Sequence, residues 1–182
     1  MKSFSARELT CTAIGVALIV ICSWVSVPTA IPFTLQTFAV CLVTALLGLK
    51  MSLWAVLCYI ALALVGVPVL SGFRGGPGAL LGVTGGYVVG FLFTALTVGF
   101  AVKKRGRSLP VLVFSMAAGI LLCYAFGTAW FMIAMDIKEK TYTIAAALSA
   151  CVIPFIIPDL VKLAAAMTIS KQIKRIGITR RR

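Results

Sequence analysis

The sequence predicts an all-α integral membrane protein whose 182 residues form a single transmembrane domain over positions 1–182. Hydrophobic residues make up 62% of the chain and its mean hydropathy is +1.12, whereas soluble domains contain about 45–50% apolar residues. The apolar residues gather in long runs that short stretches of Gly, Pro or charged residues separate. Because each helix needs about 20 apolar residues to cross a hydrocarbon core about 30 Å thick, we expect about six transmembrane helices surrounded by a lipid bilayer.

Three helices are predicted in the first part of the chain, over residues 9–27, 35–49 and 52–67. Pro28 closes the first helix and Pro68 closes the third, because proline lacks the N–H that a continuing helix needs. Gly48 and Lys50 separate the second helix from the third. No small-residue cleavage site follows the first run, so we expect it to remain as a membrane helix and not to be removed as a signal peptide.

A Gly-rich turn that carries Arg74 follows at residues 69–77, and further helical segments are predicted after it. They cover residues 79–102 and 109–135, a short surface or half-inserted helix at 142–152, and a last span that begins near Pro158 and ends before Lys171. Pro158 suits a first helical turn, where its missing N–H costs nothing. The basic cluster 103–107 and the polar run 136–140 mark two membrane interfaces.

The distribution of basic residues predicts the orientation in the membrane, because cytoplasmic loops are enriched in Lys and Arg. One side of the predicted bundle carries Lys2, Arg7, Lys50, Lys103, Lys104, Arg105, Arg107, Lys171, Lys174, Arg175, Arg180, Arg181 and Arg182. The other side carries Arg74, Lys138 and Lys140. We therefore expect a multi-pass protein of the cell membrane with both termini in the cytoplasm.

Composition argues against several other classes of protein. The net charge of +13 suggests nucleic-acid binding, but the basic residues lie at helix ends with no soluble module to display them, so we expect contact with anionic lipid head groups and no nucleic-acid partner. The six Cys stand apart from one another among aliphatic residues, which argues against disulfides and a metal site. With no His and four acidic residues, the chain offers few options for a catalytic nucleophile or a metal cluster, and we expect neither an enzyme nor a cofactor. It also lacks the G-x-x-x-x-G-K-S/T phosphate loop, so any ATP hydrolysis must come from another subunit.

Asp159 and Lys162 are the ionisable residues inside the predicted spans. Placing such groups in a membrane costs ~2.5–3.5 kcal/mol each, so they must be paired, solvated or functional. Their spacing puts both on one face of the last helix, in its predicted first turn. One interpretation is a structural ion pair, with Asp159 at the positive end of the helix dipole. The other, which we favour, is a binding site for an external solute beside the Gly-rich turn.

Two patterns of small residues indicate close contacts between helices. Four glycines recur at four-residue intervals along the predicted helix 79–102: Gly78, Gly82, Gly86 and Gly90. Helix packing explains most of that stripe, although Thr84 and Tyr87 stand between its glycines and are candidates to line a pocket. Ala13 and Ala17 form a second small-xxx-small pattern, which becomes informative if the protein docks on a membrane partner.

Four stretches of the chain match the pattern of a known family. They are IPFTLQT at 31–37, GVPV at 66–69 with Gly75 and Gly76, GVTGGY at 82–87, and PDLVK at 158–162. In order, spacing and total length they resemble the biotin-specific substrate-capture (S) subunits of energy-coupling-factor (ECF) transporters, the BioY family. Val83 departs from that pattern, where family members often have proline, and Arg74 beside the glycines is a second departure.

The resemblance implies six helices with cytoplasmic termini and a biotin site that opens to the outside under the loops after the first and third helices. It also implies docking through an A-x-x-x-A motif in the first helix, which Ala13 and Ala17 match, onto a transmembrane coupling (T) protein that works with two ATPase subunits. The candidate ligand-binding residues are Asp159, Lys162, Tyr87, Thr84, Gly76, Arg74, Phe33 and Thr34. The charged pair complements the ureido and carboxylate groups of biotin, and Phe33, Tyr87 and Trp130 are suited to cover its apolar rings.

Two other functions remain open at this point. A self-sufficient secondary transporter would use Asp159 and Lys162 as a proton-coupled switch, although the chain shows no sign of inverted repeats. An intramembrane enzyme would use Asp159 as a general base, but no second acid, nucleophile or metal cluster accompanies it in the sequence.

Overall fold

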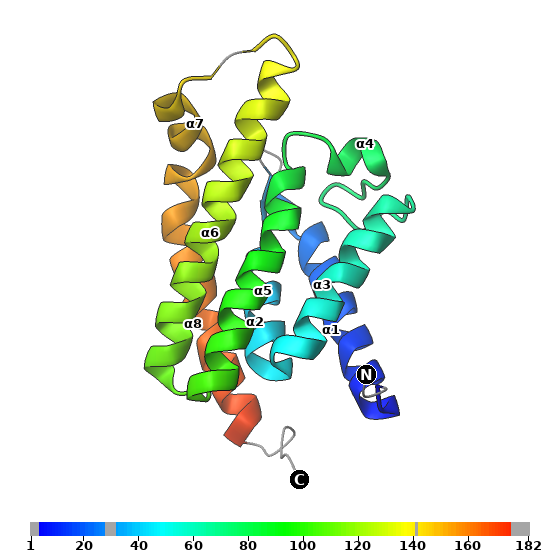
Figure 1. Cartoon of the computed structure of the whole chain (residues 1–182), viewed down its shortest axis with the longest axis vertical. Helices are drawn as coiled ribbons and strands as arrows, with labels where there is room; N and C mark the ends of the chain where they lie inside the picture. The colour runs from blue at the N-terminus through cyan, green and yellow to red at the C-terminus, as the bar shows by residue number, and fades with distance from the viewer. Residues whose placement is uncertain (1–3, 28–31, 141, 176–182) are drawn as a thin grey trace.

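A computed structural model describes residues 4–27, 32–140 and 142–175 as a bundle of helices (Figure 1). Its elements are α1 (Ala6–Trp24), β1 (Ser26–Val27), β2 (Phe33–Thr34), α2 (Gln36–Leu47), α3 (Leu49–Leu64), α4 (Pro77–Leu80), α5 (Gly85–Arg105), α6 (Leu109–Asp136), α7 (Ile144–Cys151) and α8 (Ile153–Arg175). The predicted helix end at Pro28 and the predicted basic residues Lys2, Arg180, Arg181 and Arg182 lie outside the described residues.

Four helical stretches of the described residues are long and apolar enough to cross a membrane: α1, α5, α6 and the run Ile144–Ile173, which joins α7 to α8. The prediction of an all-α membrane protein is therefore confirmed at this level. Helices α2 and α3 are shorter, with 12 and 16 residues, which at 1.5 Å per residue is about 18 and 24 Å.

Helix α2 is short but lies at the centre of the bundle. Every residue from Ala39 to Ala45 is buried, and the helix packs against α1, α3, α5 and α8. A helix that is apolar on all sides is typical of a protein core or a membrane span, and the neighbours of α2 on several sides place it in the core of this bundle. Its first residue, Gln36, is buried as well, and α2 therefore carries a polar side chain into the interior.

The two ends of the bundle differ in their elements (Figure 1). Helix α1 begins, α8 ends, and the α2–α3 and α5–α6 connections run at one end, whereas α4 and α7 lie at the other. A capping box starts α1, in which the Ser5 hydroxyl accepts from the Glu8 N–H and the Glu8 carboxylate accepts from the Ser5 N–H. The end with the α5–α6 connection carries Lys103, Lys104 and Arg105 in the last turn of α5.

Two predicted helix starts are wrong. The helix expected from position 79 is divided into α4 and α5, and residues 81–84 form turns between them. Gly78 thus lies in α4 and Gly82 in a turn, and only Gly86 and Gly90 of the predicted stripe lie on α5. Glycines have low helix propensity, and a Cβ at Gly85 would overlap the carbonyl oxygen of Leu80, so the chain bends where glycine allows a close backbone approach.

The last helix begins at Ile153 and not near Pro158, which lies inside α8. Membrane helices tolerate an internal proline when neighbouring groups satisfy the backbone that it frees. Asp159 is consequently not in the first turn, and the expected stabilisation by the positive end of a helix dipole does not apply. A short helix is present where one was expected at 142–152, as α7, but it forms one candidate span with α8 over Ile144–Ile173, and its surface or half-inserted position stays a prediction.

Helices α5 and α6 make the most extensive contact in the bundle. A Cβ at Gly90 would lie 3.2 Å from Cα of Cys123, and one at Gly119 would lie 3.0 Å from Cα of Thr94. Glycine at these two positions allows the two backbones to approach closely, as small residues do between membrane helices. The α5–α6 pair therefore forms a rigid wall on one side of the bundle.

Candidate functional site

A partly open cavity of about 70 Å³ lies between α2, α5, α6 and α8, toward the end with α4 and α7. Its lining consists of Pro32, Thr34, Gln36, Thr37, Leu70, Ser71, Arg74, Ala79, Thr84, Tyr87, Val88, Phe91, Ile120, Cys123, Tyr124, Cys151, Phe155, Asp159 and Lys162. Aromatic and aliphatic side chains alternate with a few polar groups in this set. That mixture is typical of a site for a small organic ligand.

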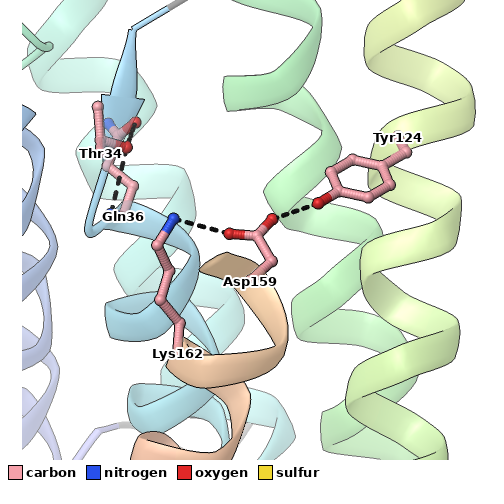
Figure 2. A network of polar contacts seen from close by, with 5 residues as sticks. All are labelled: Thr34, Gln36, Tyr124, Asp159 and Lys162. Carbon is pink, nitrogen blue, oxygen red and sulfur yellow. Dashed lines mark hydrogen bonds and ion pairs between the residues drawn. The ribbon is translucent and has the colours of Figure 1, made fainter. Parts of the chain in front are cut away.

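A charged network lies on one side of the cavity (Figure 2). The Lys162 ammonium donates to Oδ1 of Asp159 at 2.7 Å, and the Tyr124 hydroxyl donates to Oδ2 of the same carboxylate at 2.5 Å. The side chains of the ion pair are each 6% exposed. Since α8 carries both charges and α6 carries the tyrosine, the carboxylate joins two helices across the site.

One phenylalanine ring covers the ammonium group, and a second ring stacks on the first. Lys162 Nζ lies 4.0 Å from the centroid of the Phe33 ring, a cation–π contact. Phe33 in turn stacks on Phe155 with 5.9 Å between ring centroids. The short β1–β2 hairpin places Phe33 there, because Val27 pairs with Phe33 and Ser26 with Thr34. Phe33 of β2 therefore covers the ammonium group of α8.

A second polar network supports the site from α2 and α3. Thr34 donates to Oε1 of Gln36 at 3.1 Å, and Gln36 donates to the Tyr59 hydroxyl at 2.5 Å. Tyr59 then donates to the carbonyl oxygen of Val69 at 3.2 Å, and Ser23 donates to the same carbonyl. This chain of bonds holds the loop after α1 and the loop after α3 in a fixed relation, and Figure 2 shows its outer members beside Lys162.

The loop after α3 carries Arg74 to the mouth of the cavity. Trp24 of α1 donates to the carbonyl oxygen of Pro68 at 2.9 Å and stacks on Phe73. A Cβ at Gly75 would overlap the Val67 carbonyl, so glycine is required for the tight return of this loop. The Arg74 guanidinium donates to the Ser71 carbonyl at 3.1 Å and is exposed.

The α5–α6 wall of the cavity contains two reciprocal contacts between glycine and an aromatic ring. Tyr87 of α5 covers Gly127 of α6, and Trp130 of α6 covers Gly86 of α5. The Tyr87 hydroxyl lies 3.1 Å from the Thr128 hydroxyl, and the Trp130 indole donates to the Gly82 carbonyl at 3.0 Å. Trp130 therefore anchors the turn before α5; it is not among the lining residues, where we had expected it to cover a ligand.

The structure brings six of the predicted ligand-binding residues to the cavity: Asp159, Lys162, Tyr87, Thr84, Arg74 and Thr34. Phe33 reaches the site through its contact with Lys162, and Gly76 lies outside the lining, where its N–H donates to Ala63 at 2.7 Å. Tyr124 and Gln36 were not predicted. Their signal in the sequence is a polar side chain within an apolar run, which also occurs at many positions without any functional role.

Ala13 and Ala17 lie far from this site on the exposed face of α1. Between them, Gly15 faces inward, where a Cβ would lie 3.1 Å from Val43 and 3.2 Å from Leu47 of α2. The small residues of α1 thus serve two faces, one packed on α2 and one open to the surroundings.

The fold and the site define the class of the protein. Within the described residues, the apolar helical bundle contains a cavity lined by a buried ion pair and aromatic rings, which is the arrangement expected of a protein that binds a small polar solute. A sequence profile of the BioY family matches residues 1–178 of the chain, and the chain belongs to that family.

Relatives and a solved structure agree with the family assignment. The chain is 36% identical over 175 residues to the biotin transporter BioY of Thermotoga maritima, a match that covers 96% of this chain and 99% of that one. It is 34% identical to the biotin transporter BioY of Rhodobacter capsulatus, covering 92% and 93%. The crystal structure of the S-component for biotin from an ECF-type ABC transporter matches with a TM-score of 0.84 at 27% identity and covers 95% of each chain.

Proposed function

We propose that this chain is the high-affinity, biotin-binding membrane subunit of a vitamin uptake transporter that separate ATPase subunits energise. The observation that carries the proposal is the buried Asp159–Lys162 pair in the cavity of a BioY-family fold. The curated relatives are named as biotin transporters and the solved homologue as an S-component for biotin, which supports the same ligand and the same role here.

The polar groups of the cavity complement those of biotin. Its ureido ring offers two N–H donors and a carbonyl acceptor, which suit the Asp159 carboxylate and the Lys162 ammonium respectively. Charge-assisted hydrogen bonds of this kind are roughly twice as strong as neutral ones. Phe33 and Tyr87 are placed to cover the apolar bicycle, with Thr34, Thr84 and Gly76 as further candidate contacts.

We assign Arg74 as the partner of the ligand's carboxylate, because that carboxylate needs a positive charge that the buried ion pair does not supply. The buried pair is neutral as a whole, so a monoanionic ligand that only met the pair would leave one negative charge without a partner. Arg74 supplies a positive charge at the mouth of the cavity. The ureido ring then lies at the ion pair and the valerate tail points toward the opening, where water still solvates the carboxylate.

The cavity must enlarge to hold this ligand. Its volume of about 70 Å³ is well below the ~300–1,000 Å³ of ordinary ligand pockets. Contacts with glycine fix the α5–α6 wall, so we expect the segments that carry Phe33 and Arg74, which hydrogen bonds hold together, to move as one unit when biotin enters.

The membrane topology that fits this function has six spans and cytoplasmic termini. α1, α2, α3, α5, α6 and the α7–α8 run would each cross the bilayer, with α2 and α3 as the two short crossings. Lys50, Lys103, Lys104 and Arg105 belong to the end where α1 begins and α8 ends, and positive charge favours the cytoplasmic side. The site then opens to the outside, as solute capture requires.

Transport requires partners that this chain does not supply. The proposed partners are a transmembrane coupling protein and two ATPase subunits, which would bring the phosphate loop that the sequence lacks. The exposed Ala13 and Ala17 allow another helix to approach α1 closely, and we place the docking surface there. A self-sufficient proton-coupled transporter would need no such partner.

Calorimetric titration of the purified chain with biotin, lipoate and thiamine tests the function directly. We expect saturable binding of one biotin and no measurable binding of lipoate or thiamine, which lack the ureido group. Uptake into cells should then stop when the ATPase partner is inactivated and persist when the proton gradient is dissipated. Equal affinity for lipoate, or uptake that follows the proton gradient alone, contradicts the proposal.

A further inference from the structure

A second hollow lies on the outer surface of the bundle, at the end opposite the cavity. It is a groove of about 730 Å³ between the end of α5 and the start of α6. Its walls include Phe100, Ala101, Val111 and Phe114, and Lys104 and Arg105 stand at its rim. No step of the proposed function uses this groove.

The walls of the groove are apolar and face outward. Phe100 is 50% exposed and Phe114 is 75% exposed, so both rings lie where lipid chains surround the protein. Thr97 and Ser115 also line the groove, but their hydroxyls donate to carbonyls of their own helices, Thr97 to Phe93 at 2.7 Å and Ser115 to Leu112 at 3.4 Å. The hydroxyls therefore add little polarity, and the groove suits a hydrocarbon chain.

The rim of the groove is positively charged. The Lys104 ammonium lies 4.8 Å from the centroid of the Phe100 ring, so the cation is held over the apolar wall. Arg105 follows it in the last turn of α5. Thr97 and Lys104 lie seven positions apart on α5, which is a rise of about 10 Å along the helix. The charged rim is therefore displaced from the apolar floor along the helix axis, as the head group of a lipid is displaced from its acyl chain.

We propose that this groove is a specific binding site for one anionic phospholipid, with the phosphate at Lys104 and Arg105 and an acyl chain between Phe100 and Phe114. Charge complementarity selects the occupant, because basic pockets between transmembrane helices bind anionic head groups. A zwitterionic lipid also brings a positive group close to Lys104 and Arg105, so it gains less binding free energy there than an anionic lipid does. The proposal does not depend on which solute the cavity binds.

Native mass spectrometry of the full chain in detergent micelles tests the site, with phosphatidylglycerol and phosphatidylcholine of identical acyl chains offered at equal concentration. At about 1 kcal/mol for each basic residue, two residues favour the anionic lipid by about 30-fold. We expect one phosphatidylglycerol to remain bound per chain. Inorganic phosphate added in excess should not displace it, because the apolar wall holds the acyl chain.

Two variants and one control locate the binding. Lys104→Gln with Arg105→Gln should abolish the preference, whereas Lys103→Gln with Lys171→Gln, which removes the same charge from exposed residues outside the groove, should keep it. Ala101→Trp fills the groove without changing the charge and should also lower retention of phosphatidylglycerol about tenfold.

Three results would overturn the proposal. One is equal retention of the two lipids by the unmodified chain, which needs no variant to fold. Another is an equal loss in both charge variants, which would mean a diffuse surface effect. The third is unchanged retention of phosphatidylglycerol in Ala101→Trp.

Discussion

The buried ion pair allows the sharpest test of the site. In the Lys162→Met variant, Asp159 loses its counter-charge and its 2.7 Å bond, and keeps only the bond from Tyr124. Leaving one member of a buried charge pair without its partner costs about 3–5 kcal/mol of stability. If biotin uses the same ammonium, its affinity should fall by ~2–5 kcal/mol, which is about thirty-fold or more.

The double variant Asp159→Asn with Lys162→Met separates a binding role from a structural one. Replacing both charges removes the unpaired group, so the thermal unfolding midpoint should return toward that of the unmodified protein. Biotin binding should stay lost. Thr94→Val is a matched control, because Thr94 is a buried polar residue that donates to Gly119 at 3.0 Å and does not line the cavity.

Calorimetric titration with biotin and a thermal unfolding scan of each variant give the two readouts. The reasoning is refuted if the double variant is stable and binds biotin with unchanged affinity, since the pair would then be a structural element only. It is also refuted if Thr94→Val lowers the affinity as much as Lys162→Met does.

Four further predictions follow from the same geometry. Tyr124→Phe removes a hydrogen bond to a charged group, worth about 1.5–3 kcal/mol, and should weaken biotin binding at least tenfold in calorimetry. Arg74→Gln should weaken binding of biotin but leave binding of its neutral amide unchanged, and a parallel loss for both ligands would contradict the carboxylate assignment. Ala17→Trp should stop uptake while calorimetry still detects biotin binding, whereas Leu121→Trp on the exposed face of α6 should leave both intact. Gly127→Ala forces a methyl group into the tyrosine ring packed on it and should lower stability by about 1–3 kcal/mol in a thermal scan; an unchanged midpoint would mean that the α5–α6 wall is not tightly packed.

The charged pair was predictable from the sequence because ionised groups in an apolar run carry a large energetic penalty. Tyr124 and Gln36 were not, because neutral polar side chains in membrane helices carry a smaller penalty. Only the packing of α2 and α6 against α8 shows that both reach the site. The cation–π contact of Phe33 likewise depends on the pairing of β1 with β2 after α1. Each strand has only two paired residues, which is too short a stretch to be recognised in the sequence.

Helix boundaries were predicted best where charge or proline coincided with a real end. The basic residues 103–105 close α5 as expected. Pro158 was a poor guide because a first turn is only the place where proline costs least, whereas α8 continues through it, as membrane helices can when neighbouring groups satisfy the freed backbone. The glycines at 82–86 led to the opposite error. Their spacing predicted one continuous helix, but the chain turns between α4 and α5.

The closed hydrogen-bond network around Asp159 has a consequence for selectivity. Within the described residues, every buried side-chain nitrogen or oxygen atom has at least one hydrogen-bond partner, and the Asp159 carboxylate accepts from both Lys162 and Tyr124. A ligand that displaces one of these bonds gains only the difference between the hydrogen bonds it forms and those it breaks. A molecule of the right size that displaces these bonds without replacing them leaves the carboxylate or the ammonium unpaired, which is costly for a buried charge. Sites that bind by this kind of substitution reject an analogue that lacks one polar group far more strongly than one that lacks a methylene, and discrimination among vitamins then requires no separate filter.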